Sequence, residues 1–154
     1  MKMKKLAIWL ILPVAALGRL VAAGNPGPDL NLVITANDLM KFSVTRIEAH
    51  PGQIVHLTFR NEGTMPKTAM GHNWILLKLG RDPAAYAAAA SSAAEEGYQP
   101  KSRSDDVLAS TPLLGPKQSA EITFTIPAVP GHYPYLCSFP AHFLVGMKGE
   151  LVVK

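Results

Sequence analysis

The sequence predicts an all-β fold, an antiparallel β-sandwich or barrel, with one helix inserted between strands. Two observations support this class. Short apolar runs alternate with polar residues at a period of two, and proline and glycine turn signals separate these runs. The chain has 154 residues, 48% of them hydrophobic and 17% charged, which is enough for one domain with its own core. No internal repeat or second domain is visible.

Strand patterns recur from Leu30 to the end of the chain. In the second pattern Val55, Leu57 and Phe59 share one face, as expected for a strand with one buried side. The third is a continuous apolar run, which indicates a core strand. The predicted strands cover residues 30–34, 54–59, 74–77, 122–126, 133–137 and 149–153.

Residues 83–96 interrupt the strand pattern. They are rich in alanine and contain no β-branched residue, which favours a helix. Asp82 can cap the start of this helix and Gly97 can end it. We therefore expect a single helix at residues 83–96, packed on the outside of the sandwich.

The first 23 residues differ from the rest of the chain. A positive stretch at residues 1–5 precedes an apolar stretch at residues 6–17, and small residues follow before Gly24. This is the pattern of a secretory signal peptide, and the apolar stretch is short for a membrane-spanning helix. We expect a leader at residues 1–23, a single domain at residues 24–154, and an exported, periplasmic protein. An uncleaved leader that anchors the domain to the membrane, facing the periplasm, is the alternative.

The positive charge of the chain lies in this leader. The formal net charge is +4, and four of the 15 basic residues precede residue 24, whereas all 11 acidic residues follow it. The predicted domain is therefore formally neutral and has no basic run interleaved with aromatic residues. Nucleic-acid binding is excluded on these grounds.

Cys137 is the only cysteine, so it cannot form an internal disulfide. In an exported protein such a thiol is either buried and inert or bound to something. His142 and Met147 follow it along one loop with four residues in each gap, and His72 lies beside a predicted core strand. Each residue alone has an ordinary structural explanation. Together, two imidazoles, one thiolate and one thioether form the donor set of blue copper electron-transfer sites.

Three segments resemble the azurin and auracyanin group of blue copper proteins. Residues 65–76 closely resemble the azurin segment that delivers the first copper histidine. Residues 137–142 resemble azurin's Cys-Thr-Phe-Pro-Gly-His, and residues 147–149 resemble its Met-Lys-Gly. The resemblance covers the whole predicted domain and implies the cupredoxin fold, a Greek-key β-sandwich.

The resemblance also implies a cofactor and its ligands. One copper ion would cycle between Cu(I) and Cu(II), with His72, Cys137 and His142 as equatorial ligands and Met147 as the axial ligand. The additional contacts that it implies are a weak axial carbonyl from Gly71, a hydrogen bond from Asn73 to the Cys137 loop, and a hydrogen bond from the Phe139 amide to the thiolate.

The sequence departs from azurin at three points. Four residues separate His142 from Met147 where azurin has three, and this longer gap is similar to auracyanin and plastocyanin. Ala141 stands where azurin has glycine, and a single cysteine cannot make azurin's N-terminal disulfide. The axial distance, and with it the reduction potential, stays open.

We expect a diffusible, monomeric electron carrier that docks transiently on redox proteins such as cytochromes, reductases or oxidases. Its electron exit would be the edge of His142, reaching the surface within an apolar patch. The predicted patch residues are Pro140, Ala141, Phe143 and Leu144. The alternative is that residues 143–145 pack inward.

Two other classes remain as alternatives, an enzyme and a copper storage or delivery protein. Multicopper oxidases place histidines beside the copper cysteine, whereas Leu136 and Ser138 flank it here. A cysteine–histidine hydrolase would need an oxyanion hole that nothing in the sequence indicates. Delivery proteins favour exposed thiols or methionine-rich tracts, and the chain has one cysteine and no such tract. We therefore predict that the protein is not an enzyme.

Overall fold

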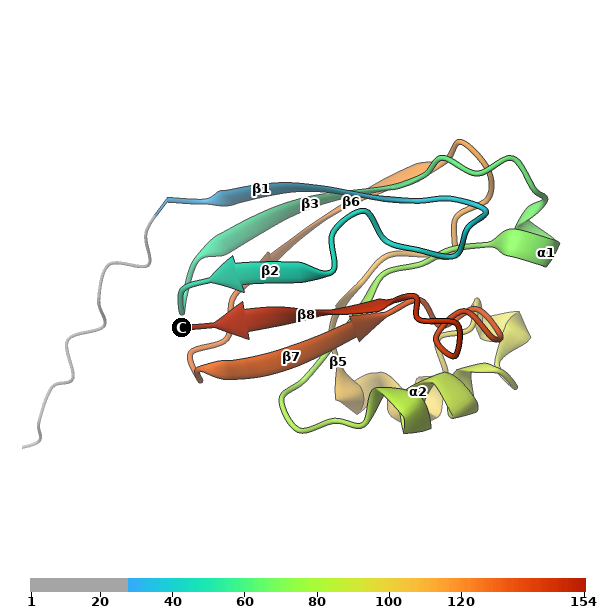
Figure 1. The fold of residues 1–154 in the computed structure, drawn as a ribbon. Coiled ribbons are helices and arrows are strands. Elements are labelled where there is room, and N and C mark those ends of the chain that lie inside the picture. Colours follow the sequence, from blue (N-terminus) through green and yellow to red (C-terminus); the bar gives the residue numbers. More distant parts are fainter. Residues whose placement is uncertain (1–27) are drawn as a thin grey trace, which may run out of the picture.

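Two β-sheets pack face to face in the computed structural model, which describes residues 28–154 (Figure 1). The predicted leader at residues 1–23 lies outside the described residues. Three strands form one sheet, in the order β1-β3-β6, and five form the other, in the order β2-β8-β7-β4-β5. No helix within residues 28–154 is long and apolar enough to cross a membrane. The predicted β-sandwich is confirmed.

The described residues form strands, two short α-helices and two 3₁₀ turns. The strands are β1 (Leu30–Ala36), β2 (Arg46–Ala49), β3 (Ile54–Asn61), β4 (Ile75–Leu77), β5 (Val107–Ser110), β6 (Ser119–Thr125), β7 (Gly131–Leu136) and β8 (Lys148–Val153). The helices are α1 (Lys67–Met70), α2 (Pro83–Ala90) and the 3₁₀ turns η1 (Ala94–Glu96) and η2 (Lys101–Asp106).

The sheets are mixed rather than purely antiparallel, which corrects the prediction. β1 pairs with β3 and β2 pairs with β8 in parallel, whereas the other pairings are antiparallel. The chain passes between the sheets after β1 and again after β2, so β2 is hydrogen-bonded neither to β1 nor to β3. An alternating pattern shows which side of a strand is buried, but it does not show which strand pairs with it.

The inserted helix is shorter than predicted. α2 ends at Ala90, and a turn and η1 complete the segment that we expected to be one helix. The hydroxyl of Ser91 donates to the carbonyl of Ala87, a local bond of the kind that competes with helix continuation. Asp82 caps the start as predicted, by accepting from the Ala84 amide at 2.8 Å, and Gly97 ends η1 with φ +65°.

β4 is buried on both faces because it lies between the opposite sheet and α2. Trp74 and Leu76 face the sandwich core, whereas Ile75 and Leu77 face Tyr86 and Ala90 of α2. This arrangement explains the continuous apolar run. It also places the residues just before β4 at the edge of the core.

Candidate metal centre

One end of the sandwich brings the predicted ligands together. β4 and β7 are antiparallel neighbours, so the start of β4 lies beside the end of β7. His72 precedes β4, and Cys137 follows β7 directly. His142 lies in the connection from β7 to β8, residues 137–147, which we call the ligand loop. Backbone hydrogen bonds in both directions between His72 and Leu114 fix the histidine segment.

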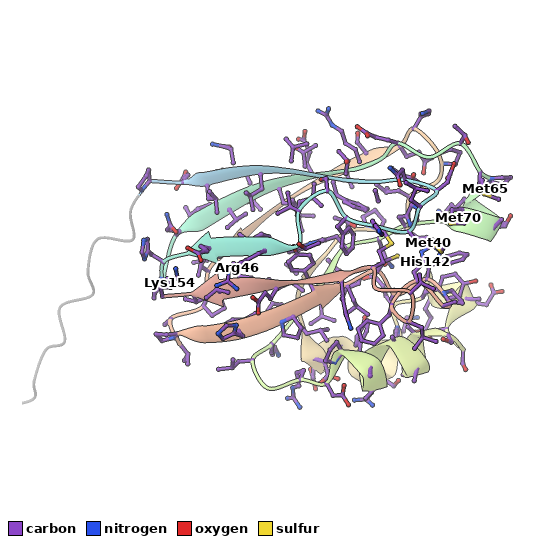
Figure 2. All side chains as sticks on the ribbon, viewed as in Figure 1. Met40, Arg46, Met65, Met70, His142 and Lys154 are labelled. Carbon is purple, nitrogen blue, oxygen red and sulfur yellow. The ribbon has the colours of Figure 1, made fainter. Side chains whose placement is uncertain are left out.

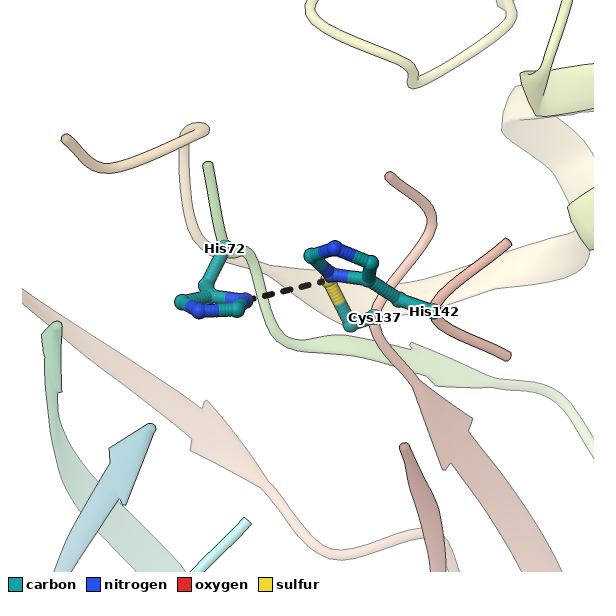
Figure 3. Close-up of side chains that lie close together, drawn as sticks. All are labelled: His72, Cys137 and His142. Atoms are coloured by element: carbon teal, nitrogen blue, oxygen red, sulfur yellow. Dashed lines mark hydrogen bonds between the residues drawn. The ribbon is translucent and has the colours of Figure 1, made fainter. Parts of the chain in front are cut away.

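The side chains of His72, Cys137 and His142 converge on one point (Figure 3). The Sγ atom of Cys137 lies 4.0 Å from Nδ1 of His72 and 3.4 Å from Nδ1 of His142. The three potential ligand atoms all lie within 4.8 Å of one another. A single ion could therefore contact two imidazole nitrogens and one sulfur, the equatorial set of a blue copper site.

Burial keeps these three side chains uncharged in the absence of metal. His72 and Cys137 are completely buried and His142 is 2% exposed. Burial raises the pKa of the Cys137 thiol to about 12, although the backbone amides of Asn73 and Phe139 act in the opposite direction and lower it. Burial and, to a lesser degree, the nearby His72 together lower the pKa of His142 to about 4. At neutral pH the site is two neutral imidazoles and a thiol, and a metal ion must displace only the thiol proton.

The metal-free protein is expected to lose stability in mild acid. Its free energy of unfolding should fall as the pH drops from about 6.5 towards about 4. In this window unfolded histidines bind protons at an ordinary pKa, whereas the folded protein keeps the pKa of His142 at about 4. The unfolded state thus binds more protons, so stability rises with pH across the window. Urea unfolding of wild type and His142→Gln measures this effect, and the variant should show a shallower slope. Equal slopes would contradict the assignment of the effect to His142.

A side-chain amide connects the segment just before β4 with the segment just after β7. Asn73 Oδ1 accepts from the Ser138 amide at 2.8 Å, and Asn73 Nδ2 donates to the Ser138 hydroxyl at 2.8 Å. Asn73 is thus hydrogen-bonded to the loop that begins at Cys137. The backbone amides of Asn73 and Phe139 both lower the pKa of the Cys137 thiol, and sequence reasoning named only the amide of Phe139. Such contacts fix the orientation of a metal-binding side chain.

Met147 closes the ligand loop. It is completely buried in the same apolar cluster as Cys137. Its carbonyl accepts from the Cys137 amide at 3.1 Å, and its amide donates to the His142 carbonyl at 2.9 Å. The first, middle and last potential ligands of the loop are thus joined through the backbone.

Gly71 and Ala141 occupy backbone positions that restrict the residue type. A Cβ at Gly71 would lie 2.7 Å from the Lys67 carbonyl oxygen, so only glycine fits beside α1. Its predicted role as a weak axial carbonyl stays a prediction. Ala141 has φ +68°, a left-handed conformation that costs a non-glycine residue about 1 kcal/mol. This explains why glycine suits the corresponding position of the azurin motif.

The ligand loop presents apolar side chains to solvent, but His142 itself lies behind them. His142 is 2% exposed, so at most a small edge of its ring reaches the surface, and the role of that edge as the electron exit stays a prediction. The rest of the ring packs on Phe139 at 4.7 Å and on His72 at 4.9 Å between centroids. Leu144 is 83% exposed and Val145 54%. Phe143 is partly buried towards the α2 cluster, so the inward alternative holds for that residue alone.

Methionines lie at the same end of the molecule. Figure 2 shows Met40, Met65, Met70 and His142 together there, far from Arg46 and Lys154 at the other end. The Asp38 carboxylate holds the loops of Met40 and Met65 together by accepting from the amide and hydroxyl of Thr64 at 2.9 and 2.8 Å. The surface around the site is therefore rich in apolar and thioether groups.

Comparisons with known proteins agree with this geometry. A family model described as copper binding proteins, plastocyanin/azurin family, matches residues 28–154. Auracyanin-B of Chloroflexus aurantiacus is 37% identical over 122 residues, which is 79% of this chain and 50% of that protein. The match thus spans half the length of that relative. Azurin iso-2 of Methylomonas sp. is 34% identical and is matched over 92% of its length and 77% of this chain.

Solved structures give the same result. Auracyanin A of Chloroflexus aurantiacus superposes with a TM-score of 0.71 at 35% identity, over 83% of this chain and all of that one. Reduced auracyanin from Roseiflexus castenholzii gives a TM-score of 0.69 at 33% identity, over 83% of this chain and 99% of that one. The fold and the buried His–Cys–His group are those of a blue copper electron-transfer protein, not of an enzyme. The chain belongs to the plastocyanin/azurin family of copper-binding proteins.

Proposed function

We propose that His72, Cys137 and His142 hold one copper ion in a trigonal plane and that Met147 is its weak axial ligand. The observation that carries this proposal is the set of three buried ligand atoms within 4.8 Å of one another. Copper supplies reversible one-electron chemistry between Cu(I) and Cu(II). The Gly71 carbonyl is the proposed weak contact on the other axial side.

The role of the protein is to keep these side chains in one arrangement for both oxidation states. Asn73 fixes the start of the ligand loop, and the backbone bonds of Met147 fix its end. The buried surroundings exclude water from the sulfur. A site that rearranges little when its charge changes suits rapid exchange of single electrons.

Addition of Cu(II) to the metal-free protein tests this function. We expect one equivalent to produce an intense blue thiolate-to-copper charge-transfer band and a narrow copper hyperfine splitting in electron paramagnetic resonance. The ion should stay bound through repeated reduction and oxidation, which separates an electron carrier from a delivery protein. Weak bands typical of a surface copper complex would contradict the proposal.

We further propose that the protein acts as a monomer and exchanges electrons through the exposed part of the ligand loop. Its partners would be redox proteins such as cytochromes, reductases or oxidases, which it would contact transiently. The proposed docking residues are Pro140, Ala141, Phe143 and Leu144. Leu144 is the most exposed large apolar residue of the described part, and a small apolar patch suits a short-lived contact.

Leu144→Glu should therefore slow electron exchange with a redox partner by about tenfold and leave the copper spectrum unchanged, because a buried unpaired carboxylate weakens docking. The matched control is Val129→Glu, in the turn between β6 and β7 at the opposite end of the sandwich, where Val129 is 57% exposed. Stopped-flow mixing with the partner measures the rate. Equal effects of both variants would exclude this docking surface.

We also propose export to the periplasm, with residues 1–23 as a signal peptide and residues 24–154 as the mature domain. The charge and hydropathy pattern of the leader supports this proposal. Membrane contact would follow only if the leader is retained. Mass spectrometry of the protein from a periplasmic extract shows whether it begins at Gly24.

A further inference from the structure

Tyr98 connects the helical insert, residues 83–106, to the metal centre through a series of rings. Its ring meets that of Phe139 in an edge contact at 5.0 Å and 65°. The Phe139 ring lies 4.7 Å from that of His142, which lies 4.9 Å from that of His72. The insert packs beside β7 and the ligand loop (Figure 1). The ring of Tyr98 therefore limits the positions that Phe139, and through it His142, can take.

The main chain of Tyr98 makes a second contact with the ligand loop. Its carbonyl accepts from the Ser138 hydroxyl at 2.5 Å. The same hydroxyl oxygen lies 3.2 Å from Asn73 Oδ1. A hydroxyl has one hydrogen, and the shorter contact takes it. Ser138 thus accepts from Asn73 and donates to Tyr98, which joins the insert, the ligand loop and the His72 segment in one network.

The backbone of Tyr98 has a strained conformation at the position where it makes these two contacts. Its φ is +60°, a left-handed conformation that is rare for a bulky aromatic residue. The surroundings hold it there, because its amide donates to the Ala93 carbonyl at 2.9 Å and the Gln99 side chain donates to the Thr111 carbonyl at 2.9 Å. Strained residues of this kind persist where neighbouring structure fixes them, and they concentrate at functional sites.

We propose that Tyr98 is a positioning residue for the copper site, which braces the ligand loop from the helical insert. Its side chain acts on Phe139, and its carbonyl acts on Ser138. These are the two residues that follow Cys137, and the Phe139 amide also contacts the Cys137 sulfur. Tyr98 thereby sets the orientation of the thiolate and of the His142 ring without touching the ion. This inference rests on the proposed function, in which Cys137 and His142 are copper ligands.

Tyr98→Ala, Tyr98→Phe and the remote control Tyr133→Ala test the inference. Tyr133 is buried on β7, and its hydroxyl donates to the Val129 carbonyl at the opposite end of the sandwich. Tyr98→Ala should lower copper affinity about tenfold in competition with a chelator and widen the copper hyperfine splitting. Tyr98→Phe should restore both, because the ring and not its hydroxyl makes the contact. Tyr133→Ala should reduce thermal stability while it leaves affinity and hyperfine splitting unchanged.

Wild-type affinity and hyperfine splitting in Tyr98→Ala would overturn the inference, and so would equal effects of Tyr98→Ala and Tyr133→Ala on both readouts. If Tyr98→Ala does not fold, Tyr98→Leu, which keeps the bulk without the ring, should show the same loss of affinity. An unchanged affinity in that variant would also overturn the inference. A wild-type protein that does not turn blue with copper contradicts the proposed function instead, so the two failures are distinguishable.

Discussion

Cys137→Ala should abolish the intense blue band completely, because that absorption requires a thiolate bound to Cu(II) and the chain has no other cysteine. The Cys137 sulfur also lies 4.0 Å from Nδ1 of His72 and 3.4 Å from Nδ1 of His142, so its loss leaves two imidazoles without their common neighbour. Copper bound by the remaining donors should give weak bands and a wide hyperfine splitting. Visible absorption and electron paramagnetic resonance after addition of Cu(II) measure the change.

Met147→Leu is the matched comparison for this variant. It is a swap of similar volume in a buried site and should cost less than about 1.5 kcal/mol of stability. The blue band should remain, since the thiolate and both imidazoles are intact, while the reduction potential rises because Cu(II) loses a weak donor. A blue band in Cys137→Ala, or its loss in Met147→Leu, would contradict the proposed division of roles among the ligands.

Asn73→Ala is expected to have the second-largest effect. Asn73 is completely buried and makes two hydrogen bonds to Ser138 at 2.8 Å. Its removal leaves the buried Ser138 amide without a partner, which should cost about 1–3 kcal/mol of stability. The end of β7 would also lose its link to the His72 segment, so the reduction potential and the hyperfine splitting should change as well. Urea unfolding, voltammetry and electron paramagnetic resonance give the three readouts.

Gln53→Ala is the control for Asn73→Ala. The Gln53 side chain is also buried, and it also bridges two backbone groups, by accepting from the His50 amide at 2.6 Å and donating to the Pro28 carbonyl at 2.9 Å. This bridge lies before β3, remote from the ligand loop. Gln53→Ala should lose stability with no change in potential or spectrum. If Asn73→Ala behaves in the same way, its role is in stability alone.

The potential ligands of the ligand loop could be predicted from sequence because they are close together along the chain. Cys137, His142 and Met147 lie on one connection, and their spacing alone indicated that they could share one site. His72 was added to the donor set from its residue type and its place beside a predicted core strand, and the resemblance of its flanking residues then supported it. Nothing in its local pattern says that β4 pairs with β7. The antiparallel register of Ile75 with Leu136 produces that neighbourhood.

The contacts that surround the site were harder to predict. Asn73 was found through the resemblance, but its own backbone amide and the role of Tyr98 were not, since both depend on how distant segments pack. β2 was missed because it has only four residues, so the alternation of exposed Arg46 and Glu48 with buried residues is too short to stand out. The end of α2 was misplaced because an alanine-rich composition continues past the serine pair that stops the helix.

The backbone bond between Cys137 and Met147 has a consequence for how this protein can change over evolutionary time. It continues the pairing of β7 with β8, so the two ends of the ligand loop are hydrogen-bonded to each other. A residue inserted into or deleted from the ligand loop alters the distances among Cys137, His142 and Met147, but it leaves the pairing of β7 with β8 unchanged. The scaffold and the redox tuning are therefore separable under mutation. Variation in loop length between relatives can adjust the potential to a new partner while the sandwich keeps its sequence and stability.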